Sequence, residues 1–116
     1  MGNNGKVVLI TGGTSGFGRA IAEKMVRQGA QVVITGRSEA RVQETAAQLG
    51  VKGIAADVSR PEDWVRVRDL LEREYGRLDV LVNNAGTGVV IKDLCDQTLE
   101  EIRLCVDINL MGPIYG

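Results

Sequence analysis

Histidine is absent from this 116-residue sequence, and aromatic residues, proline and cysteine are scarce. Without histidine, these residues can form neither a histidine-dependent catalytic triad nor a histidine-ligated zinc site. Cys95 and Cys105 stand ten positions apart, so they lack the C-x-x-C spacing of redox and zinc motifs. We therefore predict no metal site, and we expect both thiols to be buried apolar groups.

Long apolar runs and an excess of one charge are also missing. No run approaches the roughly 20 residues that cross a bilayer, and the first residues lack the pattern of a signal peptide, so we expect a cytoplasmic protein with no membrane partner. Lys and Arg total 14 against 15 Asp and Glu, with the two signs interspersed. This balance disfavours binding to nucleic acid. Length and composition fit one domain over residues 1–116.

Glycine is abundant, at 15 positions, and apolar segments follow two alternating patterns. Unbroken apolar runs predict buried parallel strands over residues 6–11, 31–35, 53–57 and 78–82. Apolar residues at helical spacing predict helices over residues 17–28, from a cap at Ser38 to Gly50, and from residues 59–61 to Gly76. Thr98 and Glu101 form a capping box for a last helix, with Leu99, Ile102 and Val106 as its apolar stripe. The alternation predicts an α/β fold, a doubly wound parallel sheet of the Rossmann type.

A glycine-rich turn joins the first strand to the first helix. It reads Thr11-Gly12-Gly13-Thr14-Ser15-Gly16-Phe17-Gly18. Glycines let the backbone turn tightly and expose amide groups at the helix N-terminus, which attracts a pyrophosphate. Such a turn alone is also compatible with a structural role, but the strand before it and the helix after it favour phosphate binding.

The spacing T-G-x-x-x-G-x-G, the sequence N-N-A-G at 83–86 and the later Asn109 together closely resemble the short-chain dehydrogenase/reductase family, in order and over all 116 residues. The resemblance implies that the first pattern binds the cofactor and that the second stabilises the central strand beside it. It implies that Asn109 is the catalytic asparagine, which holds a helix kink and a water connected to a catalytic lysine. The cofactor-binding residues implied are Gly12, Thr14, Ser15, Gly16, Phe17, Gly18, Arg37, Asp57, Val58, Asn84, Ala85 and Gly86.

Some of these residues have simpler interpretations. The resemblance implies that Asp57 hydrogen-bonds the adenine amino group while Val58 packs on the ring, yet Asp57 could also be a strand-end cap. Residues 83–84 could form only a turn, although the small residues in the segment 84–86 at the end of the fourth strand would let the nicotinamide ribose approach. Asn109 alone could be a helix cap.

The end of the second strand indicates which cofactor binds. An NAD site needs a carboxylate for the ribose hydroxyls, whereas the 2′-phosphate of NADP needs an arginine. Here the strand leads into Gly36 and Arg37, with no carboxylate before Glu39, and a guanidinium can hold a phosphate through two hydrogen bonds. We predict NADP(H) over NAD(H), with a solvated surface role for Arg37 as the alternative.

The family's carbonyl-orienting serine and Tyr-x-x-x-Lys pair have no counterpart here. Tyr75 has Asp79 four positions on, and Tyr115 is followed only by Gly116. Ser15, Ser38 and Ser59 are assigned to the phosphate loop and two helix caps. The chain thus resembles the cofactor-binding half of the family's domain, truncated after the fourth strand and the following helix.

The resemblance implies an NADP(H)-dependent oxidoreductase that transfers hydride to or from a small alcohol or carbonyl substrate. We expect the 116 residues themselves to be inactive and to form a homo-oligomer. The alternatives are a non-catalytic NADP-binding or regulatory module, and a fragment that assembles with another chain.

Overall fold

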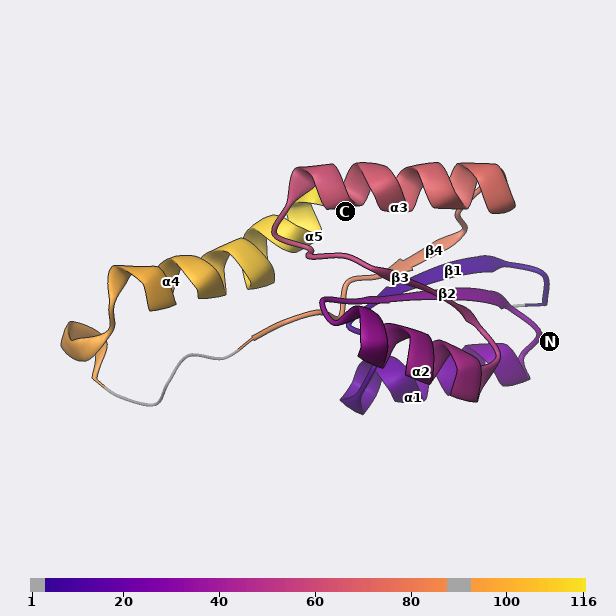
Figure 1. Cartoon of the computed structure of the whole chain (residues 1–116), viewed down its shortest axis with the longest axis horizontal. Coiled ribbons are helices and arrows are strands. Elements are labelled where there is room, and N and C mark those ends of the chain that lie inside the picture. The colour runs from indigo at the N-terminus through magenta and orange to yellow at the C-terminus, as the bar shows by residue number, and fades with distance from the viewer. Residues whose placement is uncertain (1–3, 88–92) are drawn as a thin grey trace.

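The computed structural model describes residues 4–87 and 93–116, which alternate strand and helix over most of their length (Figure 1). The alternation confirms the predicted α/β class. In chain order the elements are β1 (Val7–Thr11), α1 (Gly16–Arg27), β2 (Gln31–Gly36), α2 (Glu39–Leu49), β3 (Lys52–Ala55), α3 (Pro61–Glu74), β4 (Val80–Val82), the 3₁₀ turn η1 (Leu94–Asp96), α4 (Leu99–Val106), the π-helical turn η2 (Asp107–Met111) and α5 (Gly112–Tyr115).

The four strands form one parallel sheet in the order β3-β2-β1-β4. Helices α1 and α2 lie on one face of the sheet and α3 lies on the other (Figure 1). Because the strands are parallel, their carboxyl ends meet at one edge, and β1 and β4 are neighbours there. The strand order reverses between β1 and β4, since β2 and β3 lie on one side of β1 and β4 lies on the other. In doubly wound folds, ligands bind in the crevice at this reversal.

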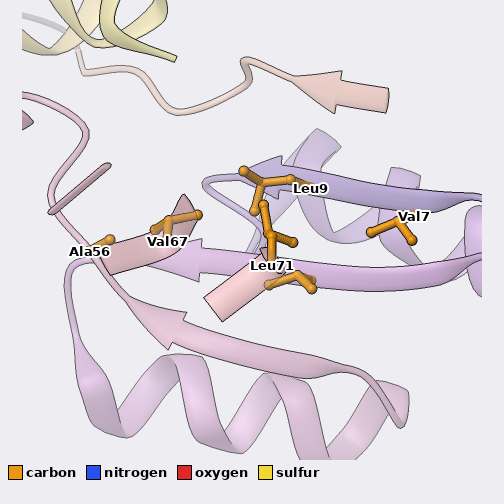
Figure 2. Packing of buried hydrophobic residues seen from close by; sticks show 6 residues of the cluster. Val7, Leu9, Ala56, Val67 and Leu71 are labelled. Carbon is orange, nitrogen blue, oxygen red and sulfur yellow. The ribbon is translucent and has the colours of Figure 1, made fainter. Parts of the chain in front are cut away.

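The core lies on both faces of β1, whose five residues are all buried. On one face, Val7 and Leu9 pack with Val67 and Leu71 of α3 (Figure 2). On the other face, Val8 and Ile10 belong to a cluster with buried alanines of α1 and α2. The strands therefore have the unbroken apolar pattern because both faces are covered.

Three strands are shorter than the sequence predicts. Strand β1 begins at Val7 rather than at residue 6. Strand β4 begins at Val80 rather than at residue 78, because Oδ2 of Asp79 accepts the N–H of Val7 at 2.7 Å and so replaces a bond of the ladder. Strand β3 ends at Ala55, which leaves Asp57 in the loop that follows.

The predicted caps of α2 and α4 are confirmed, whereas α1 begins at Gly16 rather than at residue 17 and the predicted cap of α3 is wrong. Ser38 caps α2 and Thr98 caps α4, each accepting a backbone N–H three residues on. Ser59 is not a cap, since the N-cap position of α3 is Arg60 and the hydroxyl of Ser59 donates instead to Oδ1 of Asp57.

Helix α4 lies away from the sheet (Figure 1). None of the residues of α4 is buried, and the predicted stripe of Leu99, Ile102 and Val106 is 61%, 38% and 43% exposed. The prediction that both thiols are buried is wrong. Cys95 is exposed and Cys105 is only half-buried. No helix within the described ranges is both long and apolar enough to span a membrane.

Candidate functional site

A pocket of about 430 Å³ opens at the carboxyl ends of the strands. It brings together most of the residues that the sequence predicts for cofactor binding, although they come from four separate loops. Its lining contains Gly12, Thr14, Ser15, Thr35, Gly36, Arg37, Ser38, Arg41, Ala56, Asp57, Val58, Asn84, Ala85, Gly86 and Ile108. Of the predicted set, Gly16, Phe17, Gly18 and Asn109 are not among these lining residues.

The buried hydroxyl of Thr11 joins the loops that follow β1 and β4. Its Oγ1 donates to the carbonyl of Val82 at 3.3 Å and accepts the N–H groups of Asn84 and Ala85, both at 3.1 Å. One hydroxyl can make all three bonds because it carries one donor and two lone pairs. Thr11 therefore fixes the start of the N-N-A-G segment against the glycine loop.

Asn84 makes a second connection between the same loops. Its Nδ2 donates to the carbonyl of Gly12 at 3.1 Å. A Cβ on Gly12 would lie 2.9 Å from Cα of Ala85, and one on Gly18 would lie 2.5 Å from Nδ2 of Asn84. Glycine is required at these positions by close packing, and Asn84 connects two loops in addition to turning the chain.

The N-terminus of α1 begins directly after Ser15, which lines the pocket. Ser15 occupies its N-cap position without a side-chain capping bond, and the first turn contains no acidic residue. Gly16 has φ +56, and a Cβ there would meet nothing within 4 Å. Uncapped amides and the positive end of the helix dipole, open to solvent and without a competing carboxylate, suit a phosphate group.

Arginine side chains occupy the β2 side of the pocket. Arg37 and Arg41 both contribute to the lining, and within the described part of the chain neither has an ion-pair partner, whereas most other arginines do. A Cβ on Gly36, which also lines the pocket, would lie 3.0 Å from Cγ2 of Val42 and 3.1 Å from Cγ2 of Thr14. This side of the pocket can accept a dianionic group.

Another wall is the loop after β3, the strand next to β2, and this loop carries Asp57 and Val58. Oδ1 of Asp57 accepts both the N–H and the hydroxyl of Ser59, at 2.9 and 2.6 Å. The N–H of Asp57 donates to Oδ2 of Asp63 at 2.8 Å. This bond, more than the nearby Arg66, holds the pKa of the Asp63 carboxyl below its usual value, although partial burial opposes the shift. Asp57 is therefore a loop residue with an oriented carboxylate.

Asn109 lies within η2, where the helix continues from α4 into α5, so it is not a helix cap. Its Oδ1 accepts the N–H of Thr87 at 2.7 Å, and its Nδ2 donates to the carbonyl of the same residue at 2.6 Å and to Sγ of Cys105 at 3.2 Å. Its amide thereby ties the widened helical turn to the end of the N-N-A-G loop.

Several residues of the site have no strong signal in the sequence. The sequence does contain a signal for Arg41. It lies in the first turn of the helix capped by Ser38, and this turn begins at the same carboxyl end of the sheet as Arg37. Thr35 is 1% exposed, and its hydroxyl has no hydrogen-bond partner among residues 4–87 and 93–116. Phe17, in contrast, is 84% exposed and stands outside the pocket. Within the described residues, no cluster of acidic and cysteine side chains is placed to hold a metal ion.

Comparison with known proteins agrees with this geometry. The family model described as short chain dehydrogenase matches residues 6–116. The chain belongs to the short-chain dehydrogenase family. It is therefore similar to oxidoreductases with a nicotinamide cofactor, and the resemblance carried by the two motifs is confirmed.

Individual members of the short-chain dehydrogenase family match along nearly the whole chain. An NADP-dependent (R)-specific alcohol dehydrogenase of Lentilactobacillus kefiri is 40% identical over 97% of this chain and 46% of its own length. The crystal structure of a 3-ketoacyl-(acyl-carrier-protein) reductase from Brucella melitensis complexed with NADH superimposes with a TM-score of 0.92 at 34% identity, covering 97% of this chain and 47% of that one.

A second solved structure, a short chain dehydrogenase from Bacillus anthracis, gives a TM-score of 0.89 at 32% identity, with 95% and 47% coverage. The chain thus spans about half the length of the relatives it matches.

Proposed function

We propose that this chain is the NADP(H)-binding half of an oxidoreductase that transfers hydride between the nicotinamide and a small alcohol or carbonyl compound. The observation that carries the choice of NADP(H) over NAD(H) is the pair of guanidinium groups, Arg37 and Arg41, that line the pocket beside Gly36 without a carboxylate partner among the described residues. A carboxylate at that place would favour the ribose hydroxyls of NAD and repel the 2′-phosphate.

The residues present fit such a cofactor along the whole pocket. The uncapped amides of α1, reached over Gly16, would hold the pyrophosphate, and the buried hydroxyl of Thr35 is an unused polar group in the same wall. Asp57 and Val58 would hold the adenine, and Asn84, Ala85 and Gly86 would lie beside the nicotinamide ribose. The bound cofactor supplies or accepts the hydride.

Asn109 is proposed as the catalytic asparagine. Its two hydrogen bonds to Thr87 fix the backbone next to Gly86, where the nicotinamide half would lie. The 116 residues contain no Tyr-x-x-x-Lys pair, and of their three serines Ser15 lies in the phosphate loop, Ser38 caps α2 and Ser59 bonds Asp57. We therefore propose that they bind the cofactor without turnover. We also propose that the chain forms a homo-oligomer and is located in the cytoplasm.

Calorimetric titration with NADP and with NAD tests the central claim. A charge-assisted contact contributes about 1.5–3 kcal/mol, so NADP should bind roughly tenfold to a hundredfold more tightly. Equal affinities would refute the role of the two arginines, and no binding of either nucleotide would refute the site.

The alternative is a non-catalytic NADP-binding or regulatory module. Oxidation of NADPH over a panel of carbonyl compounds addresses turnover by the chain itself. Turnover above the protein-free control would show that the catalytic residues have been misassigned.

A further inference from the structure

The first turn of α3 holds the loop that forms one wall of the pocket. Two consecutive side chains of this turn, Asp63 and Trp64, each bond the backbone of a different loop residue. We propose that Asp63 and Trp64 are positioning residues that fix Asp57 and Val58 for recognition of the adenine. This inference rests on the proposed function and extends it to residues outside the pocket lining.

Asp63 holds the loop by accepting a hydrogen bond from a backbone N–H group. Its Oδ2 accepts the N–H of Asp57 at 2.8 Å, and its Oδ1 lies 3.2 Å from the guanidinium of Arg66. The same guanidinium donates to the carbonyl of Ala55, the last residue of β3, at 2.8 Å. With a side chain only 15% exposed, Asp63 connects the end of the strand to the loop through bonds that water competes for weakly.

Trp64 holds Val58, the next loop residue, through its backbone carbonyl. Its Nε1 donates to the carbonyl of Val58 at 2.9 Å. On the other side, a Cβ on Gly112 would lie 2.9 Å from Cγ2 of Val58, so the backbone of α5 packs directly against this valine. Val58 is thus held between α3 and the C-terminal helical segment.

One carboxylate oxygen of Asp57 is available, and the clamp formed by Asp63 and Trp64 holds the backbone that carries this carboxylate. Ser59 engages Oδ1, and Oδ2 has no hydrogen-bond partner among the described residues. A carboxylate oxygen accepts hydrogen bonds only, so it would accept from the amino group of adenine and repel the carbonyl oxygen of hypoxanthine. A loop that moves would lose this discrimination while keeping the phosphate contacts on the other side of the pocket.

The experiment compares NADP with its hypoxanthine analogue, by calorimetry on the full chain. For the parent chain we expect NADP to bind about tenfold more tightly than the analogue, the size of one charge-assisted hydrogen bond. Asp63→Ala should weaken NADP binding about tenfold and leave the analogue nearly unchanged, so that the preference disappears. Asp63→Asn should retain part of the preference for NADP over the analogue, since an amide oxygen can still accept the N–H of Asp57.

Asp69→Ala is the matched control. Asp69 lies on the same helix, is 55% exposed and pairs only with Arg68 among the described residues, so both affinities should stay at the parent values. A parent chain that binds neither nucleotide would refute the proposed function. A parent chain that binds NADP, with Asp63→Ala equal to Asp69→Ala, would overturn the clamp alone.

If Asp63→Ala does not fold, Trp64→Phe decides the question. It removes the donor to Val58 and retains an aromatic ring, and it should reduce the preference for NADP over the analogue. An unchanged preference in a folded Trp64→Phe chain would then refute the proposal.

Discussion

A Cβ on Gly18 would lie 2.5 Å from Nδ2 of Asn84, the same amide that donates to the carbonyl of Gly12. The glycine is therefore part of the contact between α1 and the β4 loop. Gly18→Ala should break that contact and destabilise the fold, since overpacking typically costs about 1–3 kcal/mol. Thermal unfolding should show the loss, and NADP binding should fall about tenfold or more if the loop geometry sets the affinity.

Gly16 offers the contrasting substitution. Its Cβ would meet open space, and only the positive φ is strained, at about 1–2 kcal/mol. Gly16→Ala should therefore retain the loop contacts but obstruct a pyrophosphate, which lowers NADP affinity by an order of magnitude or more. If this variant bound NADP as well as the parent chain does, the loop would be only a turn.

Arg37 and Arg41 should act on NADP and not on NAD. Replacing either with Ala removes a charge-assisted contact, and the Kd for NADP should rise at least tenfold at Arg37. The Kd for NAD should change little because no 2′-phosphate is present. Arg103→Ala, at an exposed position of α4 without an ion pair among the described residues, is the control; a parallel loss for both nucleotides would indicate a structural effect instead.

Asn109 should stabilise the loop at Thr87. Asn109→Asp retains the acceptor for the N–H of Thr87 and loses the donor to its carbonyl. We expect a loss of about 0.5–1.5 kcal/mol in the free energy of unfolding and faster hydrogen exchange at the Thr87 amide. Exchange at the parent rate would show that the two bonds do not order this loop.

The stability of the chain should depend on pH through Asp63. Its pKa in the folded chain is lowered, chiefly by the N–H of Asp57, relative to about 3.9 in an unfolded chain. The stabilising contribution is therefore complete above that value and is lost as the pH falls through the folded pKa. The difference in unfolding free energy between the parent and Asp63→Asn should be about 1 kcal/mol at pH 7 and should shrink below about pH 4. A difference independent of pH would contradict this assignment.

The chain should associate with itself. Strand β4 pairs only with β1 in the described part of the sheet, and an apolar parallel edge favours pairing with another chain. The exposed apolar side chains of α4 offer a second surface. Size-exclusion chromatography with light scattering should detect dimers or larger species, and a monomer would refute the prediction. Ile102→Glu tests whether association uses the apolar side chains of α4, and Arg103→Glu is its control. If Ile102→Glu associates as the parent chain does, the self-association is assigned to the edge of β4.

The sequence by itself determined the order of the elements and the position of the phosphate loop. Apolar runs, the glycines near α1 and the side-chain caps at Ser38 and Thr98 are local signals, because each depends on residues a few positions apart. The two motifs also indicated that the loops after β1 and β4 act together.

Only the tertiary structure decided which distant groups complete these elements. The carboxylate of Asp79 bonds the N–H of Val7 and shortens β4, and Thr11 joins two loops that are over 70 residues apart in the chain. Arg41 contributes to the pocket and Asp63 holds the N–H of Asp57 because packing of α2 and α3 on the sheet brings them there. Hydrogen bonds and close contacts of this kind depend on distances between elements, which no local pattern of residue types contains.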